Sequence, residues 1–187
     1  MNFIKIILPL IFLNSCEFAS SRKTIGENGA IQMTNGISFY AEQYEKAANL
    51  IAENQYLEAE KIYKKLTKLE PNSENSWIGL ASANAFLGNY DLAIKYNNIA
   101  LTKSPNSVLA LIGLGSAFYR KEEHFQAIRY YRKANSLDES LPDPYWGLAF
   151  CYDKLQNLDS AKYYGRIYLK KDPETKFKIY FDEILKK

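Results

Sequence analysis

The sequence predicts an all-α protein, built as a solenoid of stacked helical hairpins, and two repeated features support this prediction. Alanine recurs every 34 residues, at Ala59, Ala93, Ala127 and Ala161. Proline holds a second position of the same register, at Pro71, Pro105 and Pro173, with Glu139 in the remaining place. A fixed period of this length is typical of proteins whose repeating unit is a pair of helices.

The repeated residue types fit a helical hairpin. The small residues are expected where two helix backbones approach closely, and large apolar residues three and seven positions apart fill the space between neighbours. Proline cannot continue a helix, so it is expected to end the second helix of each unit. Ser73, Ser107 and Thr175 follow two residues after a proline, where they are expected to cap the next helix.

The pattern resembles the tetratricopeptide repeat family, whose units read W-x2-L-G-x2-Y, then G-x-Y-x2-A, then x3-F-x2-A-x4-P. The second unit matches at Trp77, Leu80, Ala81, Gly88, Tyr90, Ala93, Ala100 and Pro105. The third unit matches at Leu114, Gly115, Phe118, Ala127, Tyr131 and Ala134. The resemblance implies a right-handed α-solenoid of about four units, at 40–73, 74–107, 108–141 and 142–175.

The two ends of the repeat array differ from its middle. The first unit has Gln43 and Lys46 where large apolar residues are usual, as expected of a terminal repeat that faces water. The segment 176–187 continues the register for one helix and is interpreted as a capping helix. The side chains expected to cover the last unit are Phe177, Ile179, Tyr180, Ile184 and Leu185.

The first fifteen residues have the character of a signal peptide. Lys5 precedes a short apolar run at 6–13, which is too short to cross a bilayer as a helix. Leu13-Asn14-Ser15-Cys16 resembles a bacterial lipobox, so residues 1–15 are predicted to be a lipoprotein signal peptide and Cys16 the acylated residue. The alternatives are a plain signal peptide with an incidental cysteine and a hydrophobic helix that is retained.

Residues 16–38 are rich in Ser, Gly, Asn and Thr and show neither helical nor strand periodicity. We interpret them as a lipidated flexible tether. A short extended segment at 31–33 is the alternative. Export and acylation place the protein in a bacterial cell envelope, facing the periplasm or the cell surface.

The sequence contains no recognisable catalytic constellation, so we expect no enzyme, metal site or cofactor. His124 is the only histidine and is expected at the surface, while Cys151 is expected to be a small packing residue. The net charge of +3, without long runs of one sign, gives no indication of nucleic-acid binding. The oligomeric state is not indicated.

The family resemblance implies that the first helices of the units line a concave groove. The residues predicted to form this partner-binding groove are Tyr44, Ile51, Asn75, Ile78, Phe86, Leu109, Ile112, Tyr119, Arg120, Trp146, Phe150 and Lys154. Phe177 and Tyr180 are candidates to close one end. Chaperone-binding members of the family carry a carboxylate clamp of Lys, Asn and Arg. Only Arg120 is compatible with it, and the positions that need Lys or Asn hold Tyr44, Ala48, Ser82 and Ser116, so that mode of binding is not expected.

An aromatic groove favours an apolar or helical segment of a partner protein. Ile112, Tyr119, Trp146 and Phe150 are predicted anchors, with Arg120 and Lys154 orienting the ligand. The expected function is that of a membrane-anchored scaffold that binds another protein. By analogy with repeat lipoproteins of the same fold, it would serve outer-membrane protein insertion, pilus assembly or cell-wall synthesis. Two alternatives remain: the aromatic residues only pack between helices, or the groove holds a glycan or lipid in a carrier module.

Overall fold

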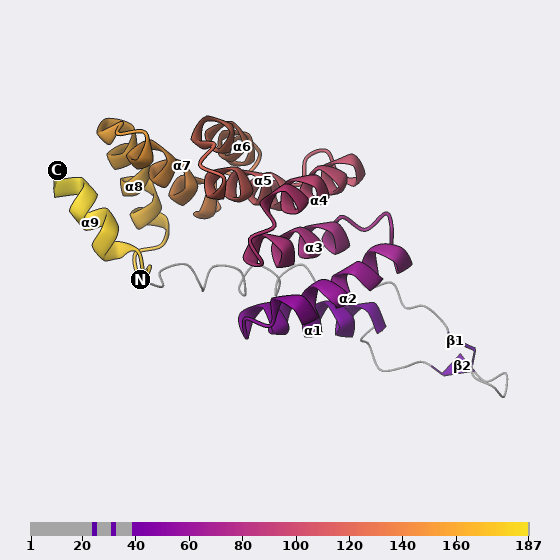
Figure 1. Ribbon diagram of the computed structural model, residues 1–187. Coiled ribbons are helices and arrows are strands. Elements are labelled where there is room, and N and C mark those ends of the chain that lie inside the picture. The colour runs from indigo at the N-terminus through magenta and orange to yellow at the C-terminus, as the bar shows by residue number, and fades with distance from the viewer. Residues whose placement is uncertain (1–23, 26–30, 33–38, 187) are drawn as a thin grey trace.

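The computed structural model describes residues 24–25, 31–32 and 39–186. Residues 39–186 form a series of helices joined by short turns (Figure 1). Their bounds are α1 Phe39–Ala52, α2 Tyr56–Leu69, α3 Glu74–Phe86, α4 Tyr90–Lys103, α5 Val108–Arg120, α6 His124–Leu137, α7 Asp143–Lys154, α8 Leu158–Lys171 and α9 Lys178–Lys186. The predicted signal peptide and Cys16 lie outside the described residues.

Two short strands precede the helices. β1 (Thr24–Ile25) pairs with β2 (Ile31–Gln32) in an antiparallel register that sets Thr24 opposite Gln32. The extended alternative at 31–33 agrees with β2 at Ile31 and Gln32, and apart from β1 and β2 the predicted tether lies outside the described residues. None of the described helices is both long enough and apolar enough to cross a membrane.

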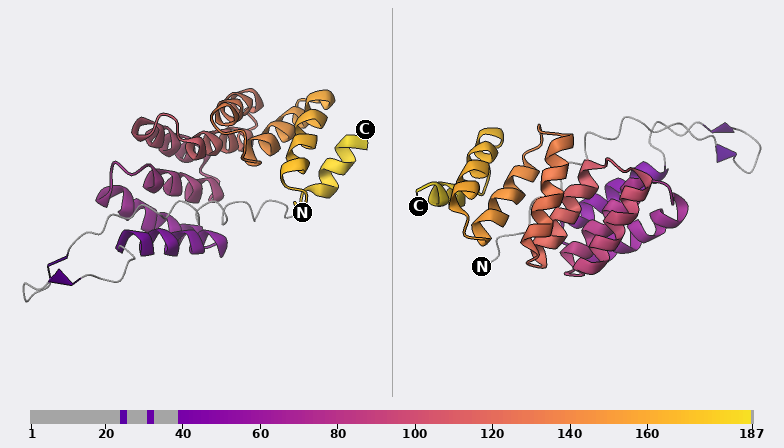
Figure 2. Two further views of the ribbon diagram at one scale, coloured as in Figure 1. Left: turned by 180° about the vertical axis from the view of Figure 1, so that it is seen from behind. Right: turned by 90° about the horizontal axis from the view of Figure 1, so that it is seen from above.

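The helices stack as consecutive hairpins along a curved array, so the predicted all-α solenoid is confirmed (Figures 1 and 2). Each helix packs against the next one in the chain, from α1 to α9. The first helices of successive units also touch each other, α1 with α3, α3 with α5 and α5 with α7. The first helices thus line the inner, concave side, and α2, α4, α6 and α8 form the outer side.

At each junction between units, a side chain of the second helix packs directly on a glycine of the next first helix. Tyr63 on α2 packs on Gly79 of α3, and Tyr131 on α6 packs on Gly147 of α7. A Cβ added to Gly79 or Gly147 would lie only 2.1 or 2.3 Å from the ring. The same register places the smaller Asn97 of α4 against Gly113 of α5. These glycines are therefore needed for close approach of the helices.

The contact is reversed between α8 and α9. Here the glycine is Gly165, on the second helix, and the aromatic residue is Phe181, on the helix that follows. Phe181 and Ile184 are buried, whereas Ile179 is 75% exposed. The prediction that Ile179 covers the last unit is thus wrong, because α9 turns its Phe181 face toward α8.

The predicted helix caps are formed unevenly. The hydroxyl of Ser107 accepts a hydrogen bond from the backbone N–H of Ala110, which confirms the cap of α5. Ser73 makes no such bond, because its hydroxyl lies 3.0 Å from the hydroxyl of Tyr44. Thr175 accepts from the backbone N–H of Phe177 at 3.3 Å, ahead of α9. Sequence position alone does not decide between a cap and a side-chain network.

Candidate functional site

The concave side carries a continuous group of aromatic rings from α5, α7, α9 and the residue that precedes α9. We call Tyr119, Trp146, Phe150, Phe177 and Tyr180 the aromatic cluster; all five are half-buried. Phe150 lies at its centre, stacked on Tyr180 with ring centroids 4.4 Å apart. The centroids of Trp146 and Tyr119 lie 5.0 and 6.3 Å from that of Phe150. The third unit, the fourth unit and the capping segment 176–187 therefore contribute to one surface.

Polar groups border the aromatic cluster. The hydroxyl of Tyr180 donates a hydrogen bond to Asp153 Oδ2 at 2.6 Å, which ties α9 to α7. Burial raises the pKa of Tyr119 to about 12, so its hydroxyl remains a donor at neutral pH. The indole N–H of Trp146 is buried and has no acceptor among the described residues. The cluster thus presents apolar ring surface with few groups that ionise near pH 7.

His124 differs from its prediction as a surface residue. It is half-buried, and its ring centroid lies 5.6 Å from that of Tyr119. Its Nδ1 is buried and has no hydrogen-bond partner among the described residues. The residue therefore supports the edge of the aromatic cluster rather than projecting into water.

The predicted groove residues fall into different environments. Ile51 and Ile78 are buried, with 7% and 5% exposure, so their prediction as partner contacts is corrected: they are core residues. Tyr44 is half-buried, and its hydroxyl hydrogen-bonds with Glu70, Ser73 and Ser76 at the junction of the first two units. Phe86 stacks on Tyr56 at 4.9 Å. The N-terminal half of the predicted groove is thus mainly structural.

The remaining predicted residues lie in the second to fourth units. Leu109, Ile112 and Arg120 are half-buried, and Asn75 and Lys154 are exposed. Ile112 and Tyr119 both pack against the buried core that contains Tyr131. The structure therefore brings Ile112, Tyr119, Trp146 and Phe150 into one region, and leaves Asn75 outside it.

Sequence reasoning missed the partnership between Gly165 and Phe181, although a signal was present. Gly165 occupies the register position of Tyr63 and Tyr131, and Phe181 occupies that of Gly79 and Gly147. Reading both positions together predicts a reversed contact. It also indicates that α9 packs like the first helix of a further unit, which brings Phe177 and Tyr180 onto the concave side.

Asp143 begins α7 in a poorly hydrated place. Burial raises the pKa of its carboxyl from 3.8 to about 6, and the nearby Asp172 acts in the same direction. The folded state therefore binds this proton more tightly than the unfolded chain does. Ionisation of Asp143 is thus costlier in the folded state, and the free energy of unfolding falls as the pH rises through about 6. The described residues include no cluster of His, Cys, Asp or Glu that could hold a metal ion.

Replacing Asp143 with Asn should remove this pH dependence. We expect Asp143→Asn to stabilise the protein by about 1–3 kcal/mol at pH 7.5 and to have little effect near pH 4. Thermal unfolding of both proteins across this range measures the difference. Parallel curves for wild type and variant would contradict the assignment. Asp159→Asn, in the first turn of α8 and exposed, is the matched control.

Comparison with known proteins gives a consistent family and fold. Residues 44–108 match a family model described as tetratricopeptide repeat. The protein CTR9 homolog of Arabidopsis thaliana is 25% identical over 124 residues, which are 66% of this chain and 11% of that protein. The RNA polymerase-associated protein CTR9 of Caenorhabditis elegans is 30% identical over 88 residues, 46% of this chain and 8% of the relative. The chain thus spans about a tenth of these relatives.

Solved structures resemble this chain over most of its length. A thermophilic TPR protein of Thermus thermophilus has a TM-score of 0.72 at 18% identity, with 79% of this chain and 81% of that one covered. A crystal structure of MamA protein has a TM-score of 0.63 at 22% identity, with 77% of each chain covered. At these identities the likeness establishes the fold alone.

Proposed function

Because the chain belongs to the tetratricopeptide repeat family, we propose that it is a non-catalytic scaffold that binds a segment of another protein on its concave side. Proteins built from this repeat generally bind protein partners. The observation that carries the proposal is the aromatic cluster, which gathers half-buried rings from the third unit, the fourth unit and the capping segment on one surface. Large rings on a rigid frame offer much contact area at little entropic cost.

The partner segment that suits this surface is an apolar or amphipathic helix. The aromatic cluster supplies ring faces and edges rather than paired charges, so it favours apolar side chains. Arg120 and Lys154 lie in the last turns of α5 and α7, the two helices that carry Tyr119, Trp146 and Phe150, and can orient a ligand that carries acidic residues. Such a segment needs no free terminus, unlike the ligand of a carboxylate clamp.

We further propose that acyl chains on Cys16 hold the protein at a membrane of a bacterial cell envelope. The proposal rests on the apolar run at 6–13 and the lipobox-like residues 13–16. Several acyl chains together give stable anchoring, since each buried CH₂ contributes about 0.8 kcal/mol. A scaffold in this place fits the assembly of envelope complexes, such as those for outer-membrane protein insertion, pili or the cell wall.

Truncating two rings of the aromatic cluster should abolish partner binding. In the full chain, Tyr119→Ala with Trp146→Ala removes two half-buried rings of the aromatic cluster and leaves the buried Phe181 and Tyr131 in place. We expect at least a tenfold loss of the proteins recovered by in-cell crosslinking and mass spectrometry, with helicity unchanged in circular dichroism. Phe125→Ala with Tyr163→Ala, on the outer side, is the matched control. Equal recovery from both double variants would refute the proposed site.

Metabolic labelling tests the anchor separately. Labelled palmitate should enter the wild-type chain and be absent from Cys16→Ala, because acylation needs the thiol of this residue. Cys151→Ala should keep the label, since Cys151 is fully buried. Labelling of Cys16→Ala at the wild-type level would exclude this attachment point without affecting the proposal for the concave side.

A further inference from the structure

We propose that the outer side of the solenoid binds the surface of a membrane that contains anionic phospholipids. The outer face is defined here as the exposed residues of α2, α4, α6 and α8. It combines two properties that the concave side lacks: an excess of cations and a set of exposed large apolar side chains. The inference adds a second surface to the proposed scaffold and does not depend on acylation of Cys16.

The second helices carry most of the positive charge of the folded part. They contain thirteen Lys and Arg against four Asp and Glu. The first helices α1, α3, α5 and α7 contain three against five. Cations near a helix C-terminus also favour the helix dipole, but that effect acts on both sets of helices alike. The asymmetry therefore belongs to the outer face as a surface.

The cations form rows across the units because they share the repeat register. One row consists of Lys61, Lys95 and Arg129, spaced by 34 residues. The other consists of Lys64, Arg132 and Arg166, in which Asn98 takes the place of the second unit. All six side chains are exposed. Residues three apart on a helix are neighbours, so the two rows run side by side.

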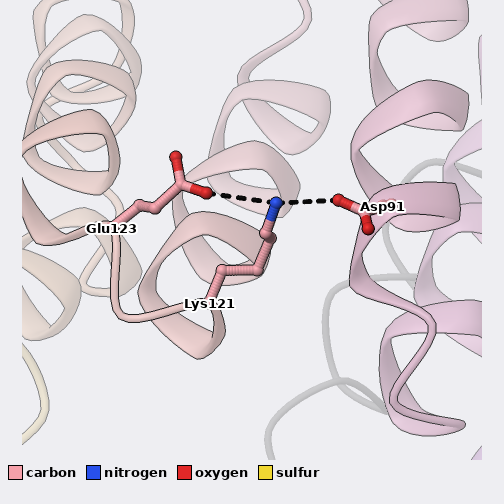
Figure 3. A network of polar contacts seen from close by, with 3 residues as sticks. All are labelled: Asp91, Lys121 and Glu123. Atoms are coloured by element: carbon pink, nitrogen blue, oxygen red, sulfur yellow. Dashed lines mark hydrogen bonds and ion pairs between the residues drawn. The ribbon is translucent and has the colours of Figure 1, made fainter.

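Among the described residues, none of these six cations forms an ion pair with a carboxylate. Among residues 40–186, the ion pairs centre on Lys121, which lies 2.8 Å from Asp91 and 3.1 Å from Glu123 (Figure 3). Lys121 stands in the turn between α5 and α6, outside both rows. Arg129 and Arg132 contact the tyrosine hydroxyls of Tyr130 and Tyr152 rather than carboxylates. The charge of the rows is therefore available to an anionic surface.

The outer face also exposes apolar side chains. Seven large hydrophobic residues of the described chain are exposed, and six of them lie on second helices: Leu57, Leu69, Leu92, Phe125, Leu137 and Tyr163. Phe125 is 77% exposed. Exposed aromatic and leucine side chains among lysines and arginines are typical of surfaces that insert shallowly at a bilayer interface. A nucleic acid attracts the cations equally well but offers little to Leu57 or Leu92.

This arrangement gives the proposed scaffold an orientation. With the outer face on the bilayer, the concave side and its aromatic cluster point away from the lipid. A partner could then reach the aromatic cluster without competing with the membrane. Because a curved face touches a flat bilayer over part of its length, the cations of the middle units are expected to contribute most.

Vesicle binding tests the proposal. The full chain carrying Cys16→Ser is sedimented with vesicles of phosphatidylcholine, with or without about one-third phosphatidylglycerol. We compare it with a row variant, Lys61→Gln, Lys95→Gln and Arg129→Gln. The matched control neutralises three cations off the outer face, Lys46→Gln, Lys178→Gln and Lys186→Gln. A third variant, Leu92→Ser with Phe125→Ser, keeps every charge.

The expected result is binding to the anionic vesicles only, weakened at least tenfold by the row variant and severalfold by Leu92→Ser with Phe125→Ser. The control should bind like the parent, and salt of about 0.5 M should weaken the parent. Equal binding to both kinds of vesicle, or equal effects of the row variant and the control, would overturn the proposal. Binding of a duplex DNA that depends on the row but not on Leu92 and Phe125, without vesicle binding, would overturn it in favour of a nucleic acid.

Discussion

Replacing Tyr131 with Ala should destabilise the protein by about 3–5 kcal/mol, one of the two largest effects expected of a single substitution. Tyr131 is fully buried on α6, and its ring fits against Gly115 and Gly147 of two neighbouring first helices. Its hydroxyl also lies 3.0 Å from Ser116 Oγ. The substitution leaves a cavity between the third and fourth units that glycines cannot fill.

The loss should also change how the protein unfolds. Because each unit of a solenoid contacts only its neighbours, a weak junction separates the array into two parts. Urea unfolding followed by circular dichroism should shift to lower denaturant and become broader. Tyr163→Ala, on the exposed outer face, is the matched control and should change the free energy of unfolding by less than about 0.5 kcal/mol. Similar shifts for both variants would contradict the proposed packing.

Replacing Phe181 with Ala should release α9, with a local loss of about 3–5 kcal/mol. The ring of Phe181 is fully buried and contacts those of Phe150 and Tyr168, at 5.5 and 5.2 Å between centroids. Hydrogen exchange in 178–186 should become fast, while α1–α6 should keep their protection. Release also exposes Trp146 and Phe150, so Trp146 fluorescence should shift to the red in a chain that carries Trp77→Phe.

The reversed glycine contact allows a rescue experiment. Gly165→Phe alone should displace α9, because the added side chain meets the ring of Phe181. Combined with Phe181→Gly, it recreates the arrangement of Tyr131 on Gly147, and protection of α9 should return in large part. Ile179→Ala, on the exposed side of α9, is the control and should leave exchange unchanged. A double variant as unprotected as Phe181→Ala would contradict the reversed contact.

The repeat register made most of the fold predictable from the sequence. Positions 34 residues apart repeat the same packing, so Ala59, Ala93, Ala127 and Ala161 are all buried as expected. The predictions were wrong where a side chain has two possible sets of neighbours. Ile51 and Ile78 belong to first helices, whose residues serve both the core and the concave surface, and the pattern does not separate these roles. Ser73 bonds Tyr44 instead of capping α3, because the tyrosine hydroxyl from α1 reaches it.

The candidate site was predictable in part for the same reason. Tyr119, Trp146 and Phe150 follow from register positions alone, and the structure brings their rings together. The contribution of Tyr180 depends on which face of α9 packs against α8, and the amphipathic pattern of nine residues does not decide this. The contact of Phe181 with Gly165 sets the orientation of α9, and that orientation brings Tyr180 onto the ring of Phe150.

Site-specific photo-crosslinking in living cells shows whether the concave side binds a protein segment. A photoreactive residue is placed at Ile112 or Lys154, beside the aromatic cluster, and in a parallel strain at Lys95 or Tyr163 on the outer face. We expect one discrete adduct from the concave positions, which disappears when Trp146→Ala is added, and no such adduct from the outer positions. The same adduct from both sides, or its persistence with Trp146→Ala, would contradict binding on the concave side.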